Sequence, residues 1–156
     1  MATIRFAVLE DAPIILDFIV ALAQYEELAH EVSATLPDLK ETLFGENPCA
    51  EALICIADDQ PVGFALFFRS YSTFLAKPGI HLEDLFVLPE HRNKGYGKQL
   101  LDAVIAIAQK RLYGRVEWNV LDWNKSAIKF YQQMGAKPVS GWTRYRLQES
   151  DITKHH

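Results

Sequence analysis

The stretch that decides the fold runs from residue 82 to residue 101 and reads LEDLFVLPEHRNKGYGKQLL. Its first part is an apolar run that ends at Pro89, which predicts a strand. Its last part begins an apolar helical pattern, and Gly95 and Gly97 lie in the turn between the two. A strand, a glycine turn and a helix together gather backbone N–H groups at the positive end of the helix. This arrangement predicts a phosphate-binding turn.

The register of the turn excludes two other phosphate-binding motifs. A P-loop that ends in the Gly-Lys pair at 97–98 would need glycine where Arg92 stands and serine or threonine where Gln99 stands. A dinucleotide loop that starts at Gly95 would need a small residue at Leu100. The remaining pattern is RxxGxG, in which the glycines leave room for a pyrophosphate and basic side chains surround it.

Apolar spacing in the rest of the chain predicts one mixed α/β domain. We predict a single domain over residues 1–150 and a tail over 151–156, in which His155 and His156 resemble a purification-tag remnant. We predict strands over 3–8, 52–57, 62–68, 80–88, 116–121 and 142–147, and helices that begin near Asp11, Thr35, Gly97 and Lys125.

The composition of the chain limits which partners and which cellular compartment we expect. The chain has 156 residues, of which 49% are hydrophobic, and a net charge of −4. An acidic balance makes nucleic acid an unsuitable partner, and no apolar run is long enough to cross a membrane. Cys49 and Cys55 form no CxxC pair, and no histidine spacing predicts a metal site. We therefore expect a cytoplasmic protein.

The charge is unevenly distributed. Residues 1–50 carry two basic and nine acidic side chains, a net charge of −7, whereas the remaining residues carry a net charge of +3. Such an asymmetry suits a cationic ligand near the first third and an anionic ligand near the rest. Alternatively, the acidic side chains of residues 1–50 only form the solvated surfaces of helices, which would give the same charge asymmetry.

Residues 82–97 resemble the acetyl-CoA-binding strand, loop and helix start of the GNAT acetyltransferases, and residues 123–136 resemble the second part of that signature. The resemblance implies the GNAT fold, a central, mostly antiparallel sheet that is splayed at the cofactor site and has helices on both faces. It implies acetyl-CoA as cofactor and a homodimer. The implied cofactor-binding residues are Leu85, Phe86, Val87, Arg92, Asn93, Lys94, Gly95, Tyr96, Gly97, Lys98, Asn124, Ser126 and Tyr131.

Three short segments, 25–26, 82–84 and 122–124, resemble the diamine (spermidine/spermine) N-acetyltransferase subgroup. The acidic residues expected shortly before the late tryptophan, Trp142, are absent, and the hairpin at 58–61 is shorter than in that subgroup. A shorter primary amine, including a lysine analogue or an amino acid, therefore stays open beside a polyamine. The predicted acceptor-binding residues are Tyr25, Glu26, Glu83, Asp84, Trp118 and Asn119.

Acetyl transfer to an amine needs the unprotonated amine. An aliphatic ammonium has a pKa of about 10.4, so deprotonation near neutral pH costs roughly 4 kcal/mol. We predict Glu83 as the base, directly or through water, on the strand face opposite Asp84 and partly buried. Alternatively, the two carboxylates lie at a kink and only bind a cation or cap the strand. The resemblance implies that Tyr131 donates a proton to the leaving thiolate; a core tyrosine is the alternative.

These residues predict an N-acetyltransferase that moves acetyl from acetyl-CoA to a primary amine of a small cationic acceptor, such as a diamine, a polyamine, thialysine or an amino acid. Because neither cysteine has a histidine partner, direct transfer in a ternary complex is expected. Acetylation of a protein N-terminus or lysine is a second hypothesis, and an acyl-CoA-binding sensor without catalysis is a third.

Overall fold

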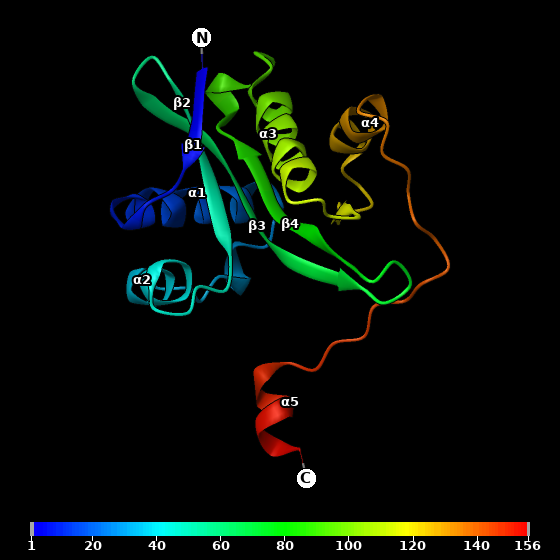
Figure 1. Ribbon diagram of the computed structural model, residues 1–156. Helices are drawn as coiled ribbons and strands as arrows, with labels where there is room; N and C mark the ends of the chain where they lie inside the picture. The colour runs from blue at the N-terminus through cyan, green and yellow to red at the C-terminus, as the bar shows by residue number, and fades with distance from the viewer. Residues whose placement is uncertain (1, 156) are drawn as a thin grey trace. The chain divides into compact units, whose positions relative to one another are not determined.

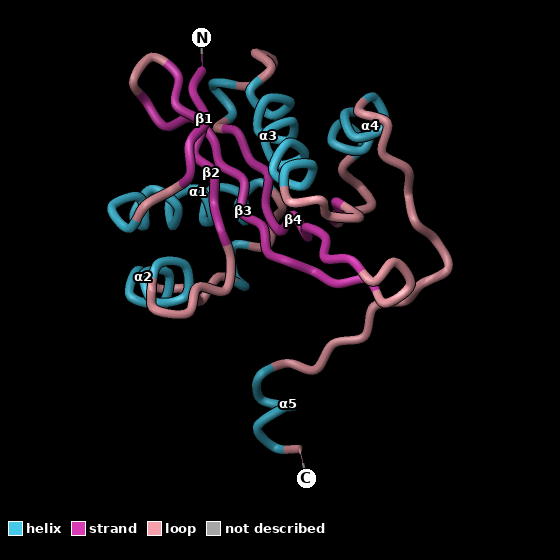
Figure 2. Tube along the Cα trace, viewed as in Figure 1, coloured by secondary structure: helices cyan, strands magenta, loops and turns pink. Residues whose placement is uncertain are grey.

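The computed structural model describes residues 2–155, and the chain divides after Asn119 into two compact units. The first unit contains a five-stranded sheet in the order β1-β2-β3-β4-β5 (Figure 2). Its strands are β1 (Ala2–Phe6), β2 (Glu51–Ala57), β3 (Gln60–Ser72), β4 (Lys77–Val87) and β5 (Val116–Trp118). Strands β1 to β4 pair antiparallel, and β5 pairs parallel to β4. The predicted mixed, mostly antiparallel sheet is confirmed.

Helices cover both faces of this sheet, as Figure 1 shows for the first unit. They are α1 (Ala12–Tyr25), α2 (Leu36–Phe44) and α3 (Tyr96–Lys110). Short 3₁₀ turns precede each helix: η1 (Leu9–Asp11) before α1, η2 (Ala29–Glu31) before α2 and η3 (Pro89–His91) before α3. Helices α1 and α2 lie on one face and α3 lies on the other. The predicted helix starts agree with these bounds to within a few residues.

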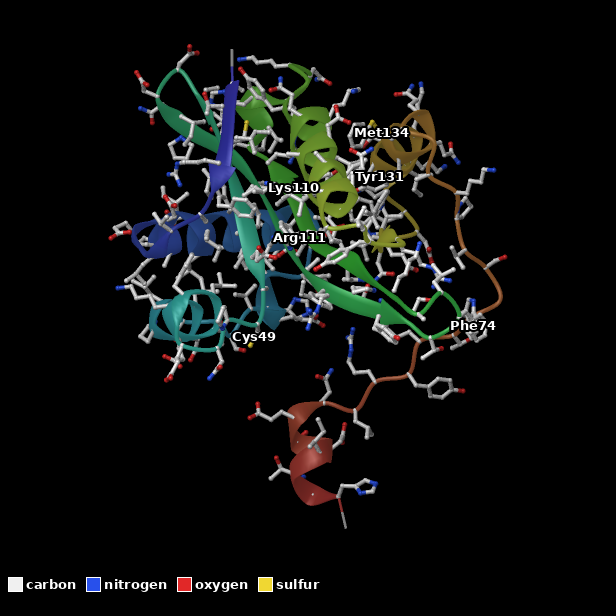
Figure 3. The ribbon with its side chains drawn as sticks, viewed as in Figure 1. Cys49, Phe74, Lys110, Arg111, Tyr131 and Met134 are labelled. Carbon is white, nitrogen blue, oxygen red and sulfur yellow. The ribbon has the colours of Figure 1, made fainter. Side chains whose placement is uncertain are left out.

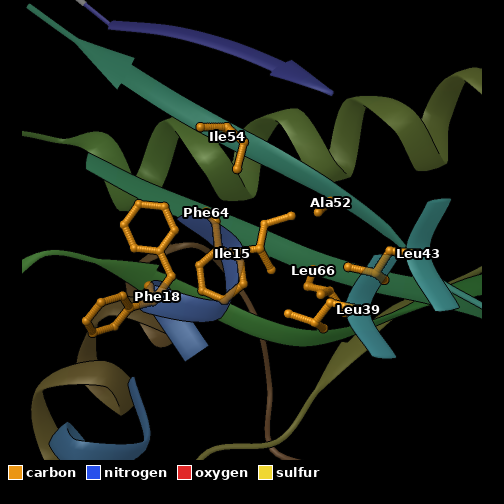
Figure 4. Close-up of a cluster of buried hydrophobic side chains, with 9 residues drawn as sticks. Ile15, Phe18, Leu39, Leu43, Ala52, Ile54, Phe64 and Leu66 are labelled. Atoms are coloured by element: carbon orange, nitrogen blue, oxygen red, sulfur yellow. The ribbon is translucent and has the colours of Figure 1, made fainter. Parts of the chain in front are cut away.

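The core on the α1 and α2 face is aromatic and aliphatic (Figure 4). The ring of Phe18 from α1 stacks on Phe64 of β3 at a centroid distance of 5.3 Å and meets the edge of Phe86 of β4 at 6.4 Å. Ile15 and Ile54 are fully buried in the same cluster. Full burial of one such side chain contributes about 1.5–3 kcal/mol, so these contacts hold the middle of α1 against β3 and β4.

Two local devices set the starts of the early helices. Thr35 precedes α2, where its Oγ1 accepts from the Asp38 N–H at 3.3 Å and its N–H donates to the Asp38 carboxylate at 3.2 Å. These two hydrogen bonds form a capping box at the helix start that the sequence predicts near Thr35. Asp11 precedes α1, but its carboxylate accepts two hydrogen bonds from Arg5, at 2.7 and 2.9 Å, rather than capping the helix. The hydrogen bonds from Arg5 lower the pKa of Asp11.

The second unit contains α4 (Lys125–Gln133) and α5 (Glu149–Lys154). The start of α4 agrees with the prediction. The strand predicted over 142–147 is wrong: this segment forms no strand, and Trp142 and Tyr145 are exposed. A strand needs a hydrogen-bonded neighbour, which alternation along the chain cannot supply. For the same reason the strand predicted over 116–121 ends at Trp118. Within residues 2–155, no helix is both long and apolar enough to span a membrane.

Candidate active site

Strand β4 has one residue more than its partner at the centre of the sheet. Leu66 of β3 pairs with Asp84, and the next residue, Phe67, pairs with Leu82. Glu83 therefore lies between two paired residues and has no counterpart on β3. This geometry is a β-bulge, which bends a strand and redirects its side chains.

The bulge places both central carboxylates on the same face of the sheet. His81 pairs with Phe68 and Asp84 pairs with Leu66, and Phe68 and Leu66 share a face because they are two residues apart. Glu83 is two residues from His81 and therefore shares that face too. The prediction that Glu83 and Asp84 lie on opposite faces is wrong, because strict alternation does not count the inserted residue. The shared face is the one covered by α1 and α2.

The two carboxylates differ in burial. The Glu83 side chain is 55% exposed and lies 3.6 Å from His81 Nε2, so the expectation that Glu83 is partly buried is wrong. Asp84 is the less exposed of the two. Burial raises the pKa of Asp84 to about 7, helped by the negative charges of Glu83 and Glu26. Burial also raises the pKa of Glu26, at the end of α1.

Asp84, which sequence reasoning assigned only to acceptor binding, is therefore a carboxyl group that can exchange a proton near neutral pH. One signal was available in the sequence. Glu83 and Asp84 are adjacent in an apolar strand, and strict alternation points neighbouring side chains to opposite faces. One of the two carboxylates is therefore expected to face the core. The burial of Asp84 follows from its packing beside Leu66, a member of the core cluster.

The end of β4 leaves backbone groups on one side unused by β5. The β5 ladder covers only Ile80–Leu82, whereas the β3 ladder continues to Val87. The backbone groups of Leu85 and Val87 face this edge, where the Val87 carbonyl already accepts from Arg92 Nε. Pairing of this edge with an extended ligand arm stays a prediction. The Phe86 side chain is only 4% exposed, and its backbone pairs with Phe64 of β3 rather than facing the open edge.

The turn after β4 has the backbone shape of an anion site. Gly95 precedes α3 with φ +84°, a left-handed conformation that favours glycine, and Asn93 also has a positive φ. Because Gly95 has no side chain, no side chain caps the first N–H groups of α3. A methyl group at Gly97 would come no closer than 4.0 Å to any neighbour, so the space beside it is open. The turn therefore fits a phosphate group.

The basic side chains of the turn have different surroundings. Lys94 is exposed, and Lys98 pairs with Asp102 one helical turn on, at 2.8 Å. The Arg92 side chain instead faces its own chain: its Nε donates to the Val87 carbonyl at 3.0 Å. Its guanidinium carbon lies 4.6 Å from the centre of the Tyr25 ring. Sequence reasoning missed this contact, for which no local signal exists.

The remaining predicted residues lie at the end of the first unit and in the second. Trp118 closes β5, and Asn119 is exposed. Asn124 is buried, and its Oδ1 accepts from the Ala127 N–H at 3.3 Å and from Ser126 Oγ at 3.4 Å. Figure 3 shows Tyr131 on α4; it is partly buried, with its ring 5.4 Å from that of Phe130. The functional roles of these residues stay predictions.

Among residues 2–155, no cluster of three or more His, Cys, Asp or Glu side chains could hold a metal ion. Both cysteines are free: Cys49 is exposed and Cys55 is buried. Burial raises the pKa of the Cys55 thiol, which disfavours the nucleophilic thiolate.

Comparison with known proteins agrees with this geometry. Residues 19–136 match the model of the Acetyltransferase (GNAT) family. The chain is 34% identical to an L-ornithine N5-acetyltransferase of Arabidopsis thaliana, over 92% of this chain and 83% of the relative. It is 35% identical to a thialysine N-epsilon-acetyltransferase of Sus scrofa, over 93% of this chain and 91% of the relative.

Solved structures share the fold. An integron cassette protein from the mobile metagenome of V. cholerae superposes with a TM-score of 0.81 at 23% identity, covering 98% of this chain and 96% of that one. A ribosomal-protein-alanine N-acetyltransferase from Brucella melitensis superposes with a TM-score of 0.73 at 22% identity, covering 95% and 99%. With the family match and the two sequence relatives, these findings show that the chain belongs to the GNAT family and is an N-acetyltransferase.

Proposed function

We propose that this enzyme transfers the acetyl group of acetyl-CoA to the side-chain amine of a small cationic amino acid, with ornithine and thialysine as the first candidates. The observation that carries the proposal is a set of three carboxylates. Glu83 and Asp84 lie on the α1 face of β4, shortly before the glycine turn, and Glu26, which follows α1, acts electrostatically on Asp84. The printed names of the two sequence relatives support the choice of acceptor.

The acidic set suits an acceptor with a positive charge. Glu83 and Glu26 both act electrostatically on Asp84, so the three carboxylates share one negative environment. An ammonium group entering this environment gains attraction to all three. Because the acidic residues expected before Trp142 are absent, the enzyme lacks the further charges that a long polyamine would use.

The cofactor fits the other end of β4. The backbone edge of residues 85–87 would pair with the extended arm of acetyl-CoA, and the N–H groups of residues 95–98 would bind its pyrophosphate. Lys94 adds positive charge to the turn, and Asn124 and Ser126 remain candidates for further contacts. When bound, acetyl-CoA supplies the activated acetyl thioester.

Asp84 and Tyr131 divide the proton transfers. A carboxyl group with a pKa of about 7 accepts a proton from the acceptor ammonium at neutral pH, so Asp84 takes the role first predicted for Glu83. Exposed Glu83 attracts the ammonium and stays the competing candidate for the base. With acetyl-CoA bound, the acetyl group would pass to the amine nitrogen as the carbon–sulfur bond breaks. Tyr131 would donate a proton to the departing sulfur, and the second proton that the nitrogen loses on forming the amide would restore the Tyr131 hydroxyl.

Two further parts of the proposal concern the setting of the enzyme. We propose a homodimer, which the family resemblance implies and which the exposed Trp142 and Tyr145 support as contact residues. We propose a cytoplasmic location, which the two free cysteines support.

The test is the release of CoA thiol with a panel of acceptors: ornithine, thialysine, lysine, putrescine, spermidine, spermine and peptides with free N-termini. We expect kcat/KM for ornithine or thialysine to exceed that for spermine by about tenfold or more, a difference of about 1.4 kcal/mol. Preference for peptides would contradict the small acceptor. Tight CoA binding without thiol release from any acceptor would support a sensor.

The proposed role of Tyr131 is tested by Tyr131→Phe, which removes only the phenol hydroxyl. If Tyr131 is the proton donor, kcat falls by about tenfold to a hundredfold while the Kd for CoA is unchanged. Full turnover by this variant would remove Tyr131 from the mechanism.

A further inference from the structure

Arg92 is the first residue of the RxxGxG pattern, and its side chain makes three contacts within the first unit. Its Nε donates to the Val87 carbonyl at 3.0 Å. Its guanidinium carbon lies 4.6 Å from the centre of the Tyr25 ring and 5.4 Å from the centre of the Phe86 ring. Its backbone N–H donates to the Pro89 carbonyl at 3.3 Å. Both the main chain and the side chain of Arg92 are therefore engaged.

These contacts join two parts of the proposed site that are far apart in sequence. Val87 and Arg92 frame the entry to the glycine turn, on the cofactor side. Tyr25 is the last residue of α1 and directly precedes Glu26, on the acceptor side. The guanidinium lies between the Tyr25 ring and the end of β4, so the turn is attached to α1 through one side chain.

The observed geometry differs from that of a phosphate ligand. A phosphate-binding arginine presents its N–H fork to the ligand. Here Nε is used by the Val87 carbonyl, and aromatic rings from α1 and β4 lie within 5.4 Å of the guanidinium carbon. The exposed Lys94 is the turn cation that is free to face a ligand. Cation–π contacts of this kind contribute about 0.5–2 kcal/mol.

We propose that Arg92 is a positioning residue that attaches the phosphate-binding turn to the end of α1, so that affinity for CoA depends on Tyr25, a residue on the acceptor side. This inference rests on the proposed function, because it assumes that the turn binds CoA. It differs from the sequence-based prediction, in which Arg92 contacts the pyrophosphate through its charge.

The test is calorimetric binding of CoA in the absence of an acceptor, with the full chain. Tyr25→Leu removes the ring that contacts Arg92 and does not alter the turn itself. We expect its Kd for CoA to rise by about threefold to thirtyfold, the range of one cation–π contact. Tyr25→Phe keeps the ring and should bind CoA within about twofold of the wild type. A residue that contacts only the acceptor would leave the Kd for CoA unchanged.

Arg92→Lys keeps the charge but loses the planar group. We expect a rise in Kd similar to that of Tyr25→Leu, and we expect the double variant to bind no more weakly than the weaker single variant, because both changes remove one shared contact. In steady-state kinetics the KM for acetyl-CoA should rise in both single variants. Matched controls are Tyr71→Leu, at an exposed tyrosine of β3, and Arg111→Lys, at the end of α3 (Figure 3).

The outcomes separate this inference from the proposed function. If the wild type binds CoA and acetylates an acceptor, but Tyr25→Leu binds CoA equally well, the attachment is refuted and the proposed function stands. Additive effects of the two variants, or normal binding by Arg92→Lys, would make Arg92 a phosphate ligand and also refute it. If the wild type does not bind CoA, both proposals fail. Thermal unfolding of each variant checks that it is folded.

Discussion

The acidic face of β4 and the glycine turn that follows it are built by different means. Asp84 owes its chemistry to its neighbours: the bulge at Glu83, the core beside Leu66 and the charge of Glu26 on α1. The turn owes its shape to its own backbone, with φ +84° at Gly95 and open space beside Gly97. One segment thus joins a region defined by side-chain packing to a region defined by local conformation. Substitutions on the acidic face of β4 should therefore change activity toward the acceptor, whereas substitutions in the glycine turn should change CoA binding or stability.

Asp84→Asn tests the acidic face most directly. We expect kcat/KM for the acceptor to fall by about a hundredfold or more, because the variant loses the proposed base and one negative charge. The Kd for CoA should change little. The measurement is thiol release as a function of acceptor concentration, with Asp17→Asn, an exposed aspartate of α1, as the control. If Glu83→Gln loses more activity than Asp84→Asn, then Glu83 is the base.

The raised pKa of Asp84 predicts how stability depends on pH. The folded state keeps the Asp84 proton up to about pH 7, whereas the unfolded chain loses it near pH 4. The free energy of unfolding should therefore fall as the pH rises between these values and level off above them, by roughly 2–4 kcal/mol for this group. Urea unfolding at pH 5 and pH 8 measures the change.

Asp84→Asn supplies the comparison for this pH effect, because its side chain does not titrate. The difference in stability between pH 5 and pH 8 should be smaller in the variant than in the wild type. Equal pH dependence in the two proteins would mean that Asp84 is ionised at pH 5 in the folded state, and its assignment as the tuned carboxyl would be lost.

Gly95→Ala tests the turn. An alanine with φ near +84° strains the backbone by roughly 1–2 kcal/mol. We expect a matching loss of stability or, where the turn relaxes, a rise of about tenfold in the Kd for CoA. The kcat with saturating acetyl-CoA should change less than in Asp84→Asn. Calorimetry and thermal unfolding together separate the two effects.

Gly97→Ala should have the smallest effect, with opposite signs in two measurements. The added methyl group meets no neighbour closer than 4.0 Å, and alanine favours a helix over glycine by up to about 1 kcal/mol. Stability should therefore rise while the methyl group hinders the approach of the pyrophosphate, weakening CoA binding by about threefold or more. Unchanged CoA affinity would mean that the cofactor does not approach this residue.

The same division explains which predictions from sequence are confirmed. The elements near Thr35, Gly95 and Lys125 depend on caps, glycines and apolar spacing within a few residues, and the structure has them where expected. The strand predicted over 142–147 is wrong because pairing is a property of two segments. The prediction that Glu83 and Asp84 lie on opposite faces is wrong because the inserted residue can be recognised only from the β3–β4 register.

The sequence by itself determined the mixed α/β class, the glycine turn and the charge asymmetry between residues 1–50 and the rest of the chain, since each follows from residue type and short-range spacing. Only the tertiary structure decided that Asp84 is the less exposed carboxyl and Glu83 the more exposed one, and that Arg92 packs on Tyr25. Burial, strand register and ring contacts depend on which distant residues meet, and that information is not contained in any local pattern.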